Sequence, residues 1–182
     1  LAARGALRIG AGLVTVGCPR EAISEHAARL DAVMVHEIGA GEVNGLRVAL
    51  GDGRVNALCV GPGLGLDARG KDVVADALAS KRRVVLDADA LTILSHTPDL
   101  FAALHEGCVL TPHAGEFARL FPDIAAKLEA PATKGPAYSK VDATREAAAR
   151  AGCVVLFKGP DTVIAHPDGR CRINSAHYDR AA

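Results

Sequence analysis

This sequence has no excess of charge of either sign. Twenty-one lysines and arginines balance twenty-one aspartates and glutamates, so the 182-residue chain has a formal net charge of +0. A protein without a net positive field does not attract nucleic acid or anionic lipid over its whole surface, which argues against both as partners. Any anionic ligand must therefore be held by local groups.

Long hydrophobic runs are also missing. No stretch reaches the roughly 18 apolar residues that a membrane-spanning helix needs, and no charged leader precedes an apolar segment at the start of the chain. With 49% hydrophobic and 23% charged residues, the composition is typical of a soluble globular protein that buries a substantial core. We expect one domain over residues 1–182 and no membrane partner.

The cysteines form no closely spaced pair. They are odd in number, scattered, and without a CxxC arrangement, and at least four lie in apolar, strand-like runs. We therefore expect small, reduced core residues and a cytoplasmic location. The five are Cys18, Cys59, Cys108, Cys153 and Cys171.

The first 50 residues give a mixed pattern. A helix is expected over 1–10, a strand over 13–18, and a helix after Pro19 whose apolar stripe consists of Ile23, Ala27 and Leu30. Further strands are expected near 33–38 and 46–50. Because the chain begins on Leu1 inside a helical pattern and stops just after a strand-like one, we expect a piece of a longer protein.

From residue 55 onward, apolar strands alternate with helices. The predicted strands are 55–60, 82–86, 108–110 and 153–157, and the predicted helices are 67–80, a short one after Leu91, 115–121 and 141–152. A hairpin is expected over 162–174, turning at Pro-Asp-Gly. Continuous apolar strands that alternate with helices indicate an α/β fold, with a mainly parallel sheet covered by helices on both faces.

Four of these strands end in residues suited to chemistry. The ends are Gly61-Pro62-Gly63-Leu64-Gly65, Asp87-Ala88-Asp89, Thr111-Pro112-His113 and Lys158-Gly159. In an open α/β sheet, ligands bind in the crevice at the carboxyl ends of the strands. If the strands are parallel, all four sets lie along one edge, which predicts a ligand site there.

Each set also has a purely structural interpretation. The glycine-rich turn suits a phosphate or dinucleotide, yet it matches neither standard phosphate-loop pattern, and such turns are common. Asp87 and Asp89 should point to opposite sides, one capping the next helix and the other free to carry magnesium through water. Lys158 either holds a phosphate or extends out of the sheet edge into solvent.

His113 and Glu116 are three residues apart at a helix start and can share a face. A zinc site is unfavourable here, because HxxE offers two ligands and no other His or Cys cluster has metal spacing. Glu116 at the third helical position also suits a helix cap. From the residues alone, His113 is either a ligand contact at the strand ends or part of that cap.

These segments, taken together, resemble the ADP-dependent NAD(P)H-hydrate dehydratase family, a carbohydrate-kinase-related family of the ribokinase-like superfamily. The resemblance spans nearly the whole chain and rests on AARGALRIGAGLVTV, ALCVGPGLG, VVLDADAL, LTPHAGEFARL and VVLFKGPDTVIAHPDG. It implies a ribokinase-like three-layer sandwich that repairs hydrated nicotinamide cofactors. ADP or ATP, with Mg²⁺, would phosphorylate the ring hydroxyl, and loss of phosphate would regenerate NADH or NADPH.

The resemblance also implies roles for individual residues. Gly63 and His113 correspond to contacts with the hydrated dinucleotide, and Glu116 to a residue that helps organise Mg²⁺. The adenine-nucleotide segment corresponds to Lys158, Gly159, Pro160, Asp161 and Thr162. The family tends towards homo-oligomers and is accompanied by an epimerase, either fused or separate.

Two family elements are absent from residues 1–182. These are an amino-terminal strand with a GGS-type turn and a GSGD-type element whose Asp is the expected catalytic base, so the catalytic residue stays unassigned and residues 1–182 alone are expected to be inactive. A ribokinase-like small-molecule kinase is one alternative function, although TPHAGE replaces the kinases' TPNxxE. The other alternative is a non-catalytic nucleotide-binding remnant.

Overall fold

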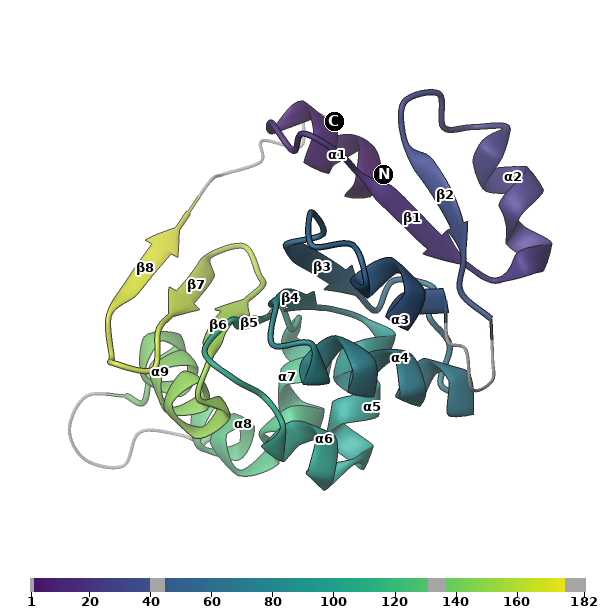
Figure 1. Cartoon of the computed structure of the whole chain (residues 1–182). Helices are drawn as coiled ribbons and strands as arrows, with labels where there is room; N and C mark the ends of the chain where they lie inside the picture. The colour runs from purple at the N-terminus through teal and green to yellow at the C-terminus, as the bar shows by residue number, and fades with distance from the viewer. Residues whose placement is uncertain (1, 40–44, 131–136, 176–182) are drawn as a thin grey trace. The chain divides into compact units, whose positions relative to one another are not determined.

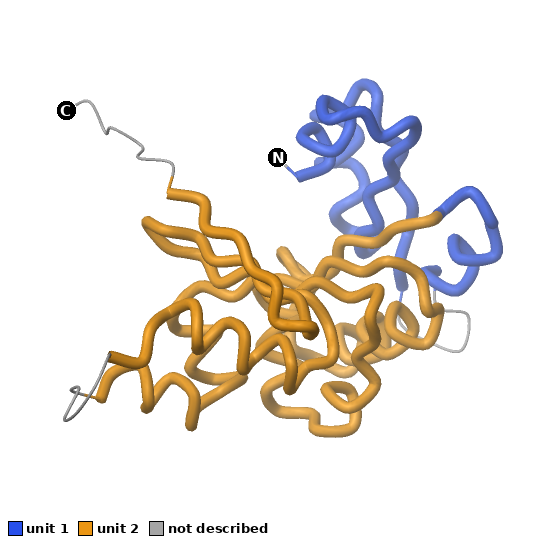
Figure 2. Tube along the Cα trace, turned by 90° about the vertical axis from the view of Figure 1, so that its left-hand side faces the viewer, with its two compact units in different colours: residues 1–55 blue, residues 56–182 orange. Residues whose placement is uncertain are grey.

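The computed structural model describes residues 2–39, 45–130 and 137–175 (Figure 1). The chain divides into two compact units, Leu1–Val55 and Asn56–Ala182, which Figure 2 colours separately. Each unit is described by itself below, and the single domain expected over residues 1–182 stays a prediction.

The first unit is built around two short parallel strands. Thr15 of the first strand pairs with Met34 of the second, and Cys18 pairs with Glu37. Cys18, Val33 and Leu46 are buried. The elements in chain order are α1 (Ala2–Arg8), β1 (Thr15–Cys18), the 3-10 helix η1 (Arg20–Ala22), α2 (Ile23–Ala27), β2 (Met34–Glu37) and α3 (Gly45–Leu50).

Two predictions for this unit are wrong. Residues 45–50 form helix α3 instead of a strand, with Leu46 buried and Val48 55% exposed. A strand would have placed those two side chains on the same face, because its side-chain period is two. The helix after Pro19 is also shorter than expected: α2 ends at Ala27, before Leu30. Of the expected half-buried stripe, Ile23 and Leu30 are partly buried and Ala27 is exposed.

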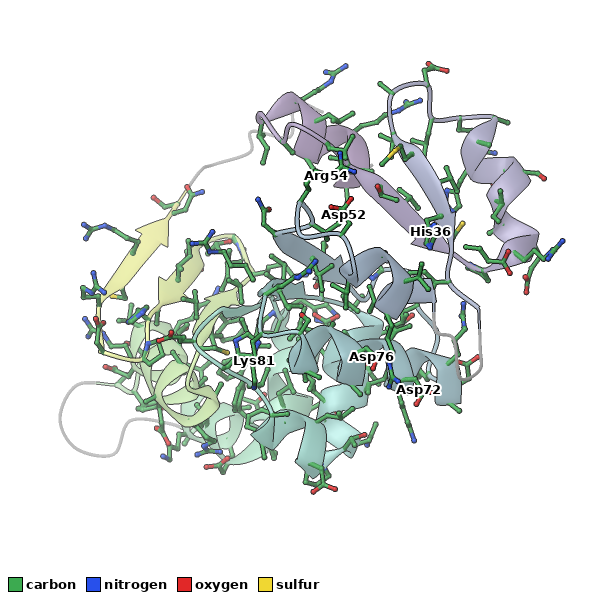
Figure 3. The ribbon with its side chains drawn as sticks, in the orientation of Figure 1. His36, Asp52, Arg54, Asp72, Asp76 and Lys81 are labelled. Atoms are coloured by element: carbon green, nitrogen blue, oxygen red, sulfur yellow. The ribbon has the colours of Figure 1, made fainter. Side chains whose placement is uncertain are left out.

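The turn after α3 is closed by a local ion pair. Arg54 donates from Nη2 to Asp52 Oδ2 at 2.7 Å and from its backbone N to Asp52 Oδ1 at 2.9 Å. Both side chains are labelled in Figure 3, where they lie beside each other. Since exposed ion pairs contribute little to stability, this contact mainly shapes the turn.

The second unit contains a six-stranded sheet in the order β3-β4-β5-β6-β7-β8. The first four strands pair in parallel, and the last two join as an antiparallel hairpin. The mainly parallel sheet and the hairpin around Pro-Asp-Gly are thereby confirmed. The strands are β3 (Ala57–Val60), β4 (Arg83–Leu86), β5 (Cys108–Leu110), β6 (Val154–Phe157), β7 (Thr162–Ala165) and β8 (Cys171–Asn174).

Helices connect the parallel strands. They are α4 (Ala68–Ala79), α5 (Asp89–His96), α6 (Pro98–Ala102), α7 (Ala114–Leu120), α8 (Pro122–Glu129) and α9 (Lys140–Ala151). Each parallel strand lies beside the next one in sequence, so right-handed connections place these helices on one side of the sheet, as Figure 1 shows. The sequence predicted helices on both faces of the sheet; within the second unit, helices cover one face (Figure 1).

The core lies between this helical layer and the sheet. Alternate strand residues face it and are completely or almost completely buried, among them Leu86, Leu110 and Val155. All four phenylalanines of the chain contribute, and the rings of Phe117 and Phe157 stack with their centroids 4.1 Å apart. Because Phe157 ends β6, this stack fixes the end of that strand against α7.

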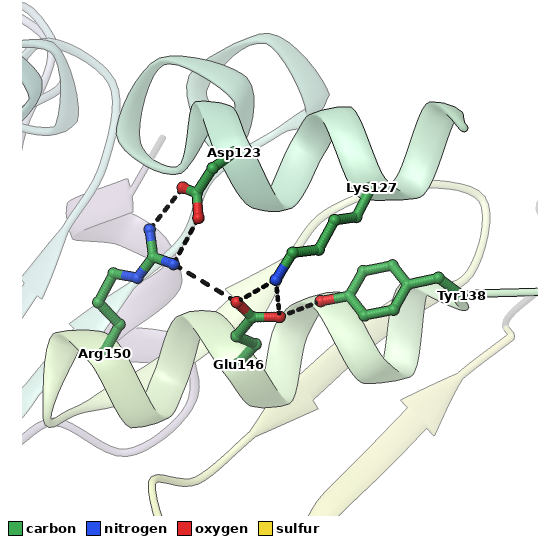
Figure 4. A network of polar contacts seen from close by, with 5 residues as sticks. All are labelled: Asp123, Lys127, Tyr138, Glu146 and Arg150. Atoms are coloured by element: carbon green, nitrogen blue, oxygen red, sulfur yellow. Dashed lines mark hydrogen bonds and ion pairs between the residues drawn. The ribbon is translucent and has the colours of Figure 1, made fainter.

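Helices α8 and α9 are joined by a network of charged side chains (Figure 4). Arg150 donates to both carboxylate oxygens of Asp123, at 2.6 and 2.7 Å. Glu146 accepts hydrogen bonds from Lys127 at 2.7 Å and from the Tyr138 hydroxyl at 2.6 Å. The network also fixes Tyr138 close to the start of α9, where a Ser139 capping box begins the helix.

All five cysteines are free, as expected. The prediction of core positions holds for three of them, whereas Cys59 is exposed and Cys171 is partly exposed. Burial raises the pKa of the Cys153 thiol to about 12, which keeps it protonated and unreactive. In the described part of the chain, no helix has both the length and the apolar character that crossing a bilayer requires.

Candidate active site at the carboxyl edge of the sheet

The four strand ends singled out by the sequence lie along one edge of the sheet. Backbone hydrogen bonds continue past the strands and join them: Asp87 N donates to Val60 O at 3.1 Å, and Lys158 N donates to Pro112 O at 2.8 Å. Because β3 to β6 run parallel, their carboxyl ends meet at this edge. The predicted convergence is confirmed, and ligands bind at such an edge in open α/β sheets.

Lys158 and Asp87 form an ion pair at this edge. Lys158 Nζ donates to Asp87 Oδ1 at 2.7 Å, and the two side chains are 38% and 29% exposed. Burial alone raises the pKa of Asp87, but the Lys158 hydrogen bond and charge, the Ala88 amide and the Thr111 hydroxyl outweigh it and lower that pKa. Asp87 is therefore ionised at neutral pH and holds the ammonium at the strand ends.

Asp89 binds the glycine-rich turn. Its Oδ2 accepts a hydrogen bond from Gly65 N at 2.9 Å. The two aspartates thus have different partners, and the prediction that one of them caps α5 is wrong. The cap position is Ala88, which makes no side-chain cap hydrogen bond. Asp89 does not cap the helix because its carboxylate accepts a hydrogen bond from a loop amide 24 residues away instead.

Backbone geometry at the start of α5 is strained. Ala88 has a φ of 47° and a ψ of −119°, values that a residue with a Cβ rarely adopts. Its position between Asp87 and Asp89 allows those neighbours to reach different partners. Strain of this kind persists where the surroundings impose it, and it is concentrated at functional sites.

The glycine-rich turn depends on its glycines. Leu64 N donates to Gly61 O at 3.0 Å, which closes the turn, and Gly63 has a φ of 70°. Gly61 has a φ of 136°, and a Cβ there would overlap the Asp87 carbonyl. Nothing lies within 4 Å of the place where a Gly63 Cβ would stand, so the apex of the turn is open to a ligand.

His113 and Glu116 form a reciprocal helix cap at the start of α7. His113 Nδ1 accepts from Gly115 N at 3.0 Å and from Glu116 N at 3.4 Å, while Glu116 Oε2 accepts from His113 N at 2.8 Å. The capping interpretation is confirmed. Since Nδ1 is an acceptor, the neutral ring carries its proton on Nε2.

The cap leaves part of His113 available. The His113 side chain is 57% exposed, whereas that of Glu116 is only 7% exposed. Nε2 lies 3.5 Å from Glu116 Oε1, beyond the usual range of a strong hydrogen bond. The ring therefore presents an N–H donor near the strand ends, and its contact with a dinucleotide stays a prediction.

The segment Lys158–Thr162 follows β6 and leads into β7. Thr162 Oγ1 donates to Gly159 O at 3.3 Å, which tightens the segment. A lysine that sequence reasoning missed, Lys140 at the start of α9, donates to the backbone oxygens of Lys158 and Asp161. Nothing in the local sequence reveals it, because its partners are 18 and 21 residues away.

The carboxylates at this edge are already engaged. Asp87 pairs with Lys158, Asp89 accepts from Gly65, and Glu116 accepts from His113. Among residues 2–39, 45–130 and 137–175, no group of three or more His, Cys, Asp or Glu side chains is arranged to hold a metal ion. The edge thus offers the Lys158 ammonium and the open apex of the glycine-rich turn to an anionic ligand, while its carboxylates position the lysine, the turn and the His113 cap.

Comparison with known proteins gives one consistent result. The family model described as NAD(P)H-hydrate dehydratase matches residues 1–182. Over 130 residues, or 71% of the chain, the sequence is 45% identical to a "Bifunctional NAD(P)H-hydrate repair enzyme Nnr" from Mycobacterium tuberculosis, 25% of which is covered. A protein of the same name from Moorella thermoacetica is 36% identical over 183 residues, which cover 96% of the chain and 33% of the relative. The chain thus spans a quarter to a third of the length of these curated relatives.

Solved structures agree with the sequence relatives. An ADP/ATP-dependent NAD(P)H-hydrate dehydratase from Bacillus subtilis, co-crystallised with ATP/Mg²⁺ and soaked with CoA, matches with a TM-score of 0.68 and 26% identity. The match covers 96% of the chain and 58% of that protein. A ribokinase-like superfamily protein from Enterococcus faecalis matches with a TM-score of 0.71 at 23% identity, over 95% of the chain and 56% of that protein, and supports the fold alone.

Proposed function

The chain belongs to the NAD(P)H-hydrate dehydratase family, and from this premise we propose that the protein containing it dehydrates hydrated NADH and NADPH with the help of an adenine nucleotide. Hydroxide is a poor leaving group, whereas phosphate is a good one. Transfer of a nucleotide phosphoryl group to the ring hydroxyl makes that oxygen part of the leaving group. Its departure as phosphate, with loss of a proton from the ring, restores the reduced cofactor.

The observation that carries the proposal is the meeting of three family segments at one edge. The glycine-rich turn after β3, the Thr-Pro-His junction after β5 and the Lys-Gly segment after β6 are joined through Asp87, Asp89 and backbone hydrogen bonds. Alignment of a nucleotide phosphate with a hydroxyl needs such a convergence, because phosphoryl transfer depends mainly on positioning and charge stabilisation.

Each segment has a proposed ligand. Residues Lys158–Thr162 bind the adenine nucleotide, with the Lys158 ammonium as the charge nearest to its phosphates. Gly63 at the open apex of its turn and the Nε2–H of His113 contact the hydrated dinucleotide. Among the described residues we assign no catalytic base; Asp87, Asp89 and Glu116 each make a structural contact.

Magnesium is proposed to arrive with the nucleotide, bound to its phosphate oxygens. The carboxylates at this edge form no ligand set of their own, because no three or more His, Cys, Asp or Glu side chains among the described residues are arranged to hold a metal ion. Glu116, buried beneath His113, is proposed to act on the ion only indirectly. The ADP/ATP-dependent enzyme from Bacillus subtilis was co-crystallised with ATP/Mg²⁺, which supports a nucleoside triphosphate as well as ADP as the bound nucleotide.

Further properties are proposed on the resemblance. The curated relatives are named bifunctional, and we propose that an NAD(P)H-hydrate epimerase, fused or separate, supplies the reactive epimer. A homo-oligomer and a cytoplasmic location are also proposed, the latter supported by five free cysteines.

A direct assay tests the function. The natural full-length protein that contains this chain is incubated with hydrated NADH, Mg²⁺ and either ADP or ATP, and the recovery of NADH absorbance is followed. Recovery that requires the nucleotide supports the proposal. Accumulation of a phosphorylated small molecule without NADH would indicate a kinase, and nucleotide binding without any turnover would indicate a binding remnant.

A further inference from the structure

Lys140, the first residue of α9, contacts the segment that follows β6. We infer that it is a positioning residue: its ammonium holds residues 158–161 in shape before the nucleotide binds. The inference rests on the proposed role of Lys158–Thr162 in nucleotide binding. Lys140 itself contacts the protein backbone in this role and does not contact the nucleotide.

Lys140 makes two hydrogen bonds and two further contacts. Nζ donates to Asp161 O and to Lys158 O, the latter at 3.4 Å, and lies 3.6 Å from Asp161 Oδ1. It also lies 4.6 Å from the centroid of the Phe157 ring, within the range of a cation–π contact. The side chain is only 19% exposed. One cation thus joins both ends of the short segment to the end of β6.

The absence of a side chain at Gly159 leaves room for the Lys140 ammonium. A Cβ at position 159 would lie 2.5 Å from Lys140 Nζ, and the φ of Gly159 is outside the left-handed region. An alanine is therefore acceptable to the backbone but displaces the ammonium. The glycine at this position provides room for Lys140, which is a different explanation from close approach of a ligand.

The two lysines at this edge have separate tasks. Lys158 extends its side chain to Asp87, 2.7 Å away, and leaves its carbonyl to Lys140. A carbonyl held by a charged donor is fixed more firmly than one that bonds to water, because charge-assisted hydrogen bonds are stronger than neutral ones. Order in the unliganded segment lowers the entropic cost of nucleotide binding.

The first test compares Lys140→Met with Lys127→Met in the natural full-length protein. Methionine keeps the apolar stem on Phe157 and removes the donors, while Lys127 pairs with Glu146 away from the segment. Lys140→Met should raise the nucleotide KM about 10-fold, the loss of one charge-assisted hydrogen bond, and change the KM for the hydrate much less. Trypsin should also cut after Lys158 faster in this variant without nucleotide. Lys127→Met should match the wild type in both measurements.

The second test is a double-mutant cycle with Gly159→Ala. If the added methyl group acts by displacing Lys140, Gly159→Ala alone raises the nucleotide KM, and the double variant is no worse than Lys140→Met. Additive effects would show that the methyl group blocks the nucleotide directly, and they would overturn the inference. Gly159→Ala also serves as the test variant if Lys140→Met folds poorly.

Nucleotide protection separates this inference from the proposed function. If ADP and ATP leave wild-type cleavage after Lys158 unchanged, the nucleotide role of the segment is wrong, and the role of Lys140 falls with it. If the nucleotide protects the wild-type segment but Lys140→Met binds nucleotide with wild-type affinity, only the Lys140 role is wrong.

Discussion

Lys158 Nζ donates to Asp87 Oδ1 at 2.7 Å across 71 residues of sequence, and this contact joins the ends of β4 and β6. Each side chain is about a third exposed, so solvent screens the pair only in part. The pair fixes the cation at the edge where the nucleotide phosphates are proposed to bind.

The Asp87–Lys158 pair should make stability depend on pH. The pKa of Asp87 is lowered in the folded protein, so the pair stabilises the fold above the usual pKa of an aspartate and loses this contribution as pH falls through the lowered value. A double-mutant cycle with Asp87→Asn and Lys158→Met should give a coupling of about 1 kcal/mol at pH 7. Denaturant unfolding at pH 7 and pH 3 measures it, and a coupling that is equal at both would contradict the assignment.

His113 has two roles that two substitutions can separate. Alanine removes both the helix cap and the Nε2–H donor, whereas asparagine is a good cap residue without the imidazole. Both variants should raise the KM for the hydrate much more than that for the nucleotide. Only His113→Ala should also lose about 1 kcal/mol of stability. Steady-state kinetics and denaturant unfolding provide the measurements; a normal hydrate KM in His113→Asn would leave His113 with a structural role alone.

Local sequence patterns predicted much of the fold and the edge of the site. Strands with short apolar runs and helices after glycine or proline junctions were recognisable, because the spacing of apolar residues along a short stretch of sequence identifies each type of element. The His113–Glu116 cap was also predictable, since its partners are three residues apart. The convergence of four strand ends then followed from the parallel order of the sheet.

Contacts between residues far apart in the chain could not be predicted from the sequence. Lys158 was expected to hold phosphate or extend into solvent, and nothing near it indicated Asp87 as its partner. One of Asp87 and Asp89 was expected to cap the next helix, because a carboxylate at a helix start usually bonds to its own helix. Instead Asp87 pairs with Lys158, and Asp89 accepts from a loop amide 24 residues away. Lys140 was hidden for the same reason. Such pairings depend on which strand ends become neighbours after folding.

Asp89 should control the glycine-rich turn. Asp89→Ala removes the acceptor for Gly65 N, and the turn that carries Gly63 should lose order. The expected result is a several-fold rise in the hydrate KM, corresponding to about 1–2 kcal/mol for a hydrogen bond to a charged acceptor. Asp89→Asn keeps an oxygen acceptor and should stay closer to the wild type. Equal defects in the two variants would indicate a role for the charge itself.

Asp123 should contribute to acid sensitivity away from the site. The hydrogen bonds from Arg150 lower its pKa to about 2, so the pair stabilises the fold above about pH 4 and loses this effect as pH falls towards 2. Asp123→Asn removes the titrating group. The stability difference between the wild type and this variant should therefore shrink between pH 5 and pH 2.5 in denaturant unfolding. A constant difference over that range would show that the ion pair contributes nothing.

Gly61 should be the least replaceable glycine of the site. Its φ of 136° is unfavourable for any residue with a Cβ, and that Cβ would overlap the Asp87 carbonyl at the end of the neighbouring strand. Gly61→Ala should therefore lower the free energy of unfolding by about 2 kcal/mol or more, because the junction of β3 and β4 must shift.

Gly53→Ala is the matched control, since nothing lies within 4 Å of its added Cβ and its φ is outside the left-handed region. It should change stability by less than about 1 kcal/mol. If denaturant unfolding gave both variants the same stability, the close approach of Gly61 to the Asp87 carbonyl would not require a glycine at position 61, and this prediction would be wrong.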